Sequence, residues 1–141
     1  QGAAVAQVAR TYAQAEPGNA VTWLDSLPDG EGKSKGLYRA YSTWAQQDAA
    51  AAGARLNQMR DSVGRDAAVD GYSRHLAHQN PQSAVEWANS ITDPKMRSNT
   101  MINNGRIYMR RNPEAARQWL AGSNLSPAIQ SRITGSKKKK R

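Results

Sequence analysis

Few residues of this sequence have the types and spacing that catalysis or metal binding requires. The clearest candidates are two histidines. His75 and His78 are three residues apart on a predicted helix, so both rings fall on one face and could share a metal ion. A third ligand, such as Asp70 or Asp66, would be needed. Histidines at this spacing are more commonly ordinary surface or interface residues, and we favour that role. We expect no metal site and no cofactor.

Other catalytic arrangements are missing from the sequence. It contains no cysteine, which excludes a disulfide framework, a thiolate nucleophile and a cysteine-ligated zinc ion but leaves the compartment open. It also contains no glycine-rich phosphate loop, no serine-nucleophile motif and no paired-carboxylate motif. We therefore predict that the chain is not an enzyme.

The elements that carry these residues follow a 32-residue repeat. Pro17, Pro81 and Pro113 lie at this interval, with Ala49 in the remaining slot. The column three residues later is always alanine, and large residues follow at helical spacing, which predicts the buried stripe of a first helix in each unit. A second helix is predicted from two further apolar columns. The first-helix columns include Ala20, Ala52, Ala84 and Ala116; those of the second helix include Leu37, Val69, Met101 and Ile133.

Each unit ends on a residue that can cap the next helix: Glu16, Asp48, Asn80 or Asn112. Residues 1–16 align with the second helix of a unit, and Arg10 interrupts what would otherwise be a signal peptide. We thus expect the chain to begin within a longer array. The predicted single repeat domain, 1–134, has a partial unit at 1–16 and units at 17–48, 49–80, 81–112 and 113–134, followed by a disordered basic tail at 135–141.

Stacked helix-turn-helix units predict an all-α fold, a right-handed α-solenoid of antiparallel helix pairs. The stripe of Ala20, Trp23, Leu24 and Leu27 resembles the tetratricopeptide-repeat superfamily, and it recurs as Ala84, Trp87, Ala88 and Ile91. The period of 32 departs from the usual length of about 34 in that family. The pairs Trp23-Leu24, Leu27-Pro28 and Trp44-Ala45 also resemble a group of bacterial repeat proteins.

The resemblance implies a peptide-binding groove on the first helices. Asp25, Asn57 and Asn89 occupy the position that faces the concave surface in the family, where an amide can hold the backbone of an extended peptide. The alternative is that these short polar residues only keep a solvated face from aggregating. The remaining predicted groove residues are the neighbouring Val21, Val85 and Arg117, with Arg60 at the edge.

The tryptophan column allows two interpretations. Trp23, Trp87 and Trp119 could stack on the bases of a single-stranded nucleic acid. They share a stripe with the repeated alanine, however, so we favour packing between helices. Truncation of Trp87 to alanine is then expected to cost about 3–5 kcal/mol.

Positive charge supports a second possible surface. Arg10, Arg74 and Arg106 share a second-helix column and Arg110 extends it, which predicts a basic ridge able to meet phosphates. Local pairing is the favoured alternative, because Asp70 and Arg74 are four residues apart on one helix. The net charge is +9, of which Lys137 to Arg141 contribute five, and we expect this run to be a solubilising tail or a cloning remnant.

These observations predict a non-catalytic scaffold that binds a protein or an extended peptide. The second candidate is a nucleic-acid-binding α-solenoid that uses the basic ridge and the lysine-rich tail. A third is a spacer or docking domain of a larger enzyme. No apolar run is long enough to span a membrane, for which about 18 residues are needed. The sequence does not identify the partner or the compartment.

Overall fold

The computed structural model describes residues 2–135, which form eight α-helices and no strand, as the all-α prediction requires. None of the helices in this part of the chain is both long enough and apolar enough to cross a membrane. The helices are α1 (Gly2–Ala15), α2 (Pro17–Asp25), α3 (Glu31–Leu56), α4 (Val63–Leu76), α5 (Pro81–Ala88), α6 (Pro94–Arg111), α7 (Pro113–Ala121) and α8 (Pro127–Thr134).

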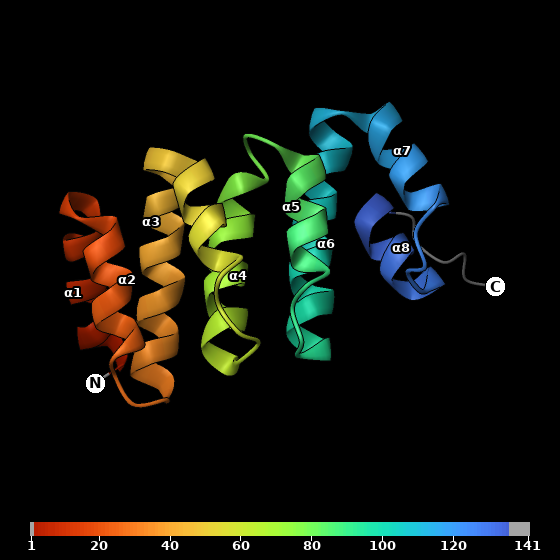
Figure 1. Cartoon of the computed structure of the whole chain (residues 1–141). Helices are drawn as coiled ribbons and strands as arrows, with labels where there is room; N and C mark the ends of the chain where they lie inside the picture. The colour runs from red at the N-terminus through yellow and green to blue at the C-terminus, as the bar shows by residue number, and fades with distance from the viewer. Residues whose placement is uncertain (1, 136–141) are drawn as a thin grey trace.

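Helical segments of opposite direction alternate along the chain (Figure 1). We call α2, residues 49–56 of α3, α5 and α7 the A segments, because they run the same way. The B segments are α1, residues 31–47 of α3, α4, α6 and α8, and they run the opposite way (Figure 1). Consecutive B segments pack on one another, from α1 on α3 through α4 and α6 to α8. Contacts therefore remain between near neighbours in the chain.

The 32-residue interval is visible in the backbone. Helix α3 bends at Asp48, whose φ of −158° and ψ of 84° are not helical. Asn80 has φ −146° and ψ 81°, and Asn112 has φ −150° and ψ 76°. The boundary expected before Ala49 is therefore present: the oppositely directed segments 31–47 and 49–56 meet at Asp48, which has the same local conformation as Asn80 and Asn112 before the next helix starts.

Side chains cap most of these helix starts as predicted. Asp48 accepts a hydrogen bond from the Ala51 N–H at 3.1 Å, and Asn80 accepts one from the Ser83 N–H at 3.2 Å. Asn112 does the same for α7. The prediction is wrong for Glu16, whose longer side chain makes no cap bond and instead accepts from Asn19 Nδ2. At the other end of the chain, Gly135 has φ 77° and terminates α8, as glycine readily does.

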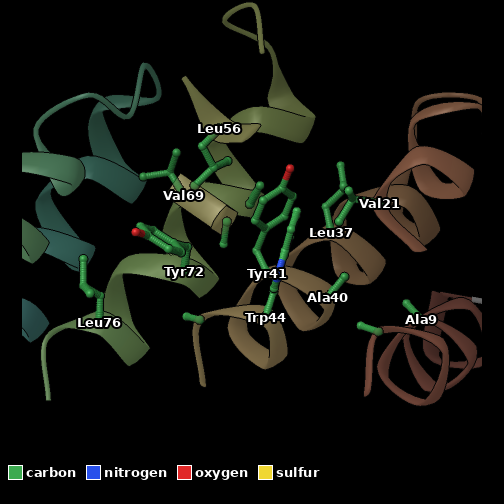
Figure 2. Packing of buried hydrophobic residues seen from close by; sticks show 14 of the residues in the cluster. Ala9, Val21, Leu37, Ala40, Tyr41, Trp44, Leu56, Val69, Tyr72 and Leu76 are labelled. Atoms are coloured by element: carbon green, nitrogen blue, oxygen red, sulfur yellow. The ribbon is translucent and has the colours of Figure 1, made fainter. Parts of the chain in front are cut away.

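The predicted apolar columns form the core. Ala20, Ala52, Ala84 and Ala116 have no exposed surface, and the Leu37 column is buried in every unit. Figure 2 shows Leu37, Tyr41, Trp44, Leu56 and Val69 converging between neighbouring helices. The small alanine column lets the A and B segments approach closely, while the larger column fills the space between units.

One glycine allows helices α3 and α4 to pack closely. A Cβ added at Gly71 of α4 would collide with the backbone carbonyl of Tyr38 in α3. The two B segments therefore approach at backbone distance, which no other residue type permits at this position.

Candidate functional site

Asp25, Asn57 and Asn89 lie along one edge of the molecule, where successive A segments end. All three are exposed. Asp25 is the last residue of α2, while Asn57 and Asn89 follow α3 and α5 with the same backbone conformation, φ −66° and ψ −17°. Because the A segments run in the same direction, their carboxyl ends share one edge (Figure 1). Each of the three residues lines a different hollow in the surface.

The first hollow, of about 340 Å³, contains Asp25, Arg55 and Arg60. Arg55 Nη2 lies 3.8 Å from Asp25 Oδ2 and donates to Thr22 Oγ1 at 2.9 Å. The pKa of Asp25 is raised above its ordinary value, because the effect of burial exceeds the opposing effect of the Arg55 and Lys33 charges. Asp25 and Arg55 in this hollow are thus already paired with each other.

The second hollow, of about 260 Å³, contains Asn57 together with Arg65, Trp87 and Ser90. Arg65 is 7% exposed, and its Nη1 donates to Ser90 Oγ at 3.3 Å. The guanidinium carbon lies 6.0 Å from the centre of the Trp87 ring, at the limit of a cation–π contact. This hollow combines an amide, a shielded cation and an indole within one cavity.

The third hollow, of about 510 Å³, lies between α5, α6 and α7 and contains Asn89, Arg97 and Trp119. Arg97 Nη1 donates to the carbonyl oxygens of Ile91 at 2.8 Å and Thr92 at 3.2 Å, which fixes the turn before α6. Glu86 lines both the second and the third hollow, so the two are neighbours on the surface.

The three hollows are built from equivalent residues 32 positions apart. Asp25, Asn57 and Asn89 supply the polar group at the end of an A segment. In the second and third hollows the next B segment supplies a cation from one column, Arg65 or Arg97, whereas Lys33 of the same column does not line the first hollow. The following unit supplies Arg55, Trp87 or Trp119. Lys33 differs in that its Nζ donates to the Asp25 carbonyl oxygen at 3.2 Å. We refer to these three cavities as the A-face hollows.

The other predicted groove residues are placed differently. Val21 has no exposed surface and belongs to the core, so the prediction that it lines the groove is wrong. Val85 is 1% exposed and forms the floor of the third hollow. Arg117 is exposed on α7 but is not part of the three A-face hollows. Val21 and Val85 directly follow the buried alanines of their helices, and on an α-helix this position also faces the core.

The tryptophans lie at the boundary between core and surface. Trp87 packs edge-on against Tyr72, with ring centres 5.3 Å apart, and Trp119 lies 5.7 Å from Tyr108. Trp23 similarly lies 6.1 Å from Tyr12. All three are half-buried. Packing between helices is thus combined with an exposed edge in the second and third hollows.

The predicted basic ridge is divided. Arg74 Nε donates to Asp70 Oδ1 at 2.5 Å, which confirms the local pair. Arg10 is exposed on α1, at the opposite end of the molecule from α8 (Figure 1). Arg106 and Arg110 instead line a hollow beside Arg132 of α8, a residue that the sequence pattern did not single out. Residues 136–141, which hold the lysine run, lie outside the described part of the chain.

The carboxylates considered as metal ligands have structural partners. Asp66 is buried and accepts hydrogen bonds from the Thr92 N–H at 2.8 Å, Thr92 Oγ1 at 2.7 Å and the Asp93 N–H at 3.1 Å. Asp70 also accepts from Thr100 Oγ1 at 2.8 Å. Among residues 2–135, no group of three or more His, Asp or Glu side chains is arranged to hold a metal ion.

A larger groove on the B segments was not predicted. It has a volume of about 580 Å³ and crosses α1, α3, α4 and α6, with Ala3, Tyr38, Ala67 and Met96 among its lining residues. Ala3 and Ala67 lie 64 residues apart in one column, but Lys35 and Asn99 occupy the positions between and after them, so the repeat gave no periodic signal for this groove.

Comparisons of the chain with known protein families, with curated proteins and with solved structures found no match.

Proposed function

We propose that this chain is a non-catalytic scaffold that binds an extended peptide along the A-face hollows. The observation that carries the proposal is the recurrence of an amide or carboxylate and an aromatic or arginine side chain at three successive unit boundaries, with a cation from one column added in the second and third hollows. A core residue recurs because every unit must pack, but packing does not require an exposed Asn57 and Asn89 beside hollows. Recurrent surface groups favour a ligand that is itself repetitive.

The finer fold that we propose is a right-handed α-solenoid related to the tetratricopeptide repeats. Its support is the order of the helices, in which each packs on near neighbours, and the shared conformation of Asp48, Asn80 and Asn112. An array of this kind offers a continuous surface, because every added unit extends it by one step.

The spacing of the hollows limits the form of the ligand. Consecutive B segments pack on one another, and packed helices lie about 8–10 Å apart, so we expect successive units and their hollows to recur at about this interval. An extended chain rises about 3.3 Å per residue, and a polyproline II helix completes a turn of three residues in about 9.3 Å. Every third side chain of such a peptide would meet one hollow.

The residues of the second and third hollows suggest which peptide side chains fit there. Trp87 and Trp119 offer an indole edge to an apolar or prolyl side chain, while Asn57 and Asn89 can each donate to and accept from the peptide backbone. The ion pair between Asp25 and Arg55 makes the first hollow the least receptive. The proposed ligand is an extended segment with apolar residues at positions i and i+3.

A selection from displayed random peptides of about twelve residues would test this function. Selected peptides should bind with affinities that fall about twofold to tenfold in Asn57→Ala and in Asn89→Ala, the loss expected for one net hydrogen bond. Gln82→Ala, which removes an exposed amide on α5 away from the hollows, is the matched control. Moving the second apolar residue of the peptide from i+3 to i+4 should also weaken binding.

Melting temperatures separate a binding effect from unfolding. Both asparagine variants should melt close to the parent chain, since the side chains are exposed. If no selected peptide responds to either substitution while the fold persists, the A-face hollows are not the ligand site.

The second candidate function is nucleic-acid binding, and the concentration of arginine on α6 and α8 favours it. Its signature is a steep loss of affinity for single-stranded RNA or DNA between low and moderate salt. A peptide bound mainly by apolar and amide contacts should respond weakly to the same change.

A further inference from the structure

Charge is unevenly divided along the chain. Residues 94–135 contain seven lysines and arginines but a single carboxylate, Glu114, whereas residues 1–93 contain eight cations and ten carboxylates. Helix α6 alone carries five cations and no carboxylate. Such segregation is unfavourable for an isolated fold, because like charges repel without compensation.

Part of this charge converges on one hollow. Arg106 and Arg110 of α6, Arg132 of α8 and His78 beyond the end of α4 line a cavity of about 410 Å³. Its other lining residues are Asn99, Asn103, Ile102 and Ile107, so no carboxylate among residues 2–135 lines it. We call it the basic hollow. Three guanidinium groups without an acidic partner form a site for an anion.

The helices that hold these arginines are fixed to each other. Arg106 Nε donates to the carbonyl oxygen of Arg132 at 2.8 Å, which joins α6 to α8. Ile133, the next residue, packs against Gly105 of α6, whose missing side chain allows the two helices to meet. The arginines are therefore presented by packed helices and not by a loop.

The basic hollow is separate from the A-face hollows. Arg97 and Arg106 are nine residues apart, which is two and a half turns of α-helix, so they project from opposite sides of α6. Arg97 lines the third A-face hollow, and Arg106 lines the basic hollow. A ligand at one site does not occupy the other.

The donors present select the kind of anion. Arginine forks pair with the several oxygens of a phosphoryl group, and the amides of Asn99 and Asn103 can add neutral donors. Within the described part of the chain the imidazole of His78 is the one ring that lines the hollow, so an aromatic platform on which nucleic-acid bases stack is missing there. Ile102 and Ile107 suit the aliphatic part of a side chain that carries the phosphate.

We propose that the basic hollow binds a phosphoryl group carried by a serine or threonine of a partner protein. A phosphoserine brings a charge of about −1.5 to −2 and three acceptor oxygens, more than a carboxylate can offer to three arginines. Phosphorylation of the partner would then control its association with this face.

The probes for this proposal are acetylated, amidated pentapeptides with central phosphoserine, serine or glutamate between glycines. They are titrated into the full chain while the side-chain Nε–H signals of Arg106, Arg110 and Arg132 are followed by NMR. We expect saturable shifts with phosphoserine, at least about tenfold weaker binding with glutamate, and no shift with serine.

Two neighbouring residues supply a matched pair of variants. Arg110→Gln removes a lining cation, whereas Arg111→Gln removes an equal charge from an exposed residue that does not line the hollow. Binding should weaken at least about fivefold in the first variant and less than about twofold in the second. Circular dichroism confirms that both retain their helices, and replacing Lys137 to Arg141 with glutamine should leave the phosphoserine shifts in place.

Three results would overturn the proposal. Equal loss in R110Q and R111Q means that the charge acts only as a diffuse field. Shifts that fail to saturate mean that there is no site. Tighter binding of a short oligouridine than of the phosphoserine peptide, lost in R110Q, assigns the hollow to nucleic acid.

Discussion

Trp87 stands between the core and the second A-face hollow, which makes it informative about both. Its ring packs edge-on against Tyr72 at 5.3 Å but stays half-buried. Trp87→Ala should therefore lower the free energy of unfolding by about 2–4 kcal/mol. This is less than the cost of about 3–5 kcal/mol for truncating a fully buried ring. Urea denaturation measures this cost. A change below about 0.5 kcal/mol would mean that the ring contributes little to packing.

His75 should make the fold sensitive to mild acid. Burial, and then the charge of neighbouring His78, lower the pKa of His75 below its ordinary value of 6.5. The unfolded chain thus binds a proton at higher pH than the folded chain, so stability falls as pH drops through about 6.5. The urea midpoint should decrease between about pH 7 and pH 5.5, and the decrease should be smaller in His75→Gln. An identical pH dependence in both chains contradicts this.

At the scale of the helix pair, Gly71 tests how closely α3 and α4 must approach. A methyl group there meets the Tyr38 backbone, which cannot rotate away, so Gly71→Ala should destabilise the chain by about 3 kcal/mol or more. Gly18→Ala is the matched control, because nothing lies within 4 Å of the added atom and alanine favours the helix. It should be neutral or stabilising by up to about 1 kcal/mol. Thermal melts compare the two, and equal effects would argue against close α3–α4 packing.

The helices were largely predictable because buried columns must recur in every unit. Ala84 and Met101 are buried where the interval places them, and Asp93 caps α6 by accepting from the Met96 N–H at 2.8 Å. The boundary at Asp48 was predictable for the same reason, because Asp48 leaves the helical conformation and caps the Ala51 N–H as Asn80 caps the Ser83 N–H.

The candidate sites were less predictable than the helices. The interval identified Asn57 and Asn89, but each hollow also needs a cation from the same unit and a side chain from the next. Arg132 could not be predicted as a site residue from the repeat, because the equivalent positions hold Gly36, Ala68 and Thr100. Surface residues are free to vary between units, and a site made from one such residue has no periodic signal.

At the scale of the whole molecule, the core is divided in two. One cluster joins α1 to α4 with part of α5 and Ile107 of α6, and a second joins Val85 and Ala88 of α5 to other residues of α6 and to α7 and α8. The basic hollow lies where the two clusters meet, because its Ile102 belongs to the second cluster and its Ile107 to the first. Stability in such a molecule is a sum of local contacts between neighbours, so its two ends need not unfold together.

Ile133→Ala tests this division. Ile133 is 3% exposed and packs onto Gly105, so its truncation should cost about 2–4 kcal/mol locally. Hydrogen–deuterium exchange should accelerate in α7, α8 and the carboxyl half of α6, while α1 and the first half of α3 keep their protection. Leu37→Ala, in the equivalent column of the first cluster, should show the reverse distribution. If both variants accelerate exchange uniformly, the chain unfolds as one cooperative unit and the two clusters are not energetically separate.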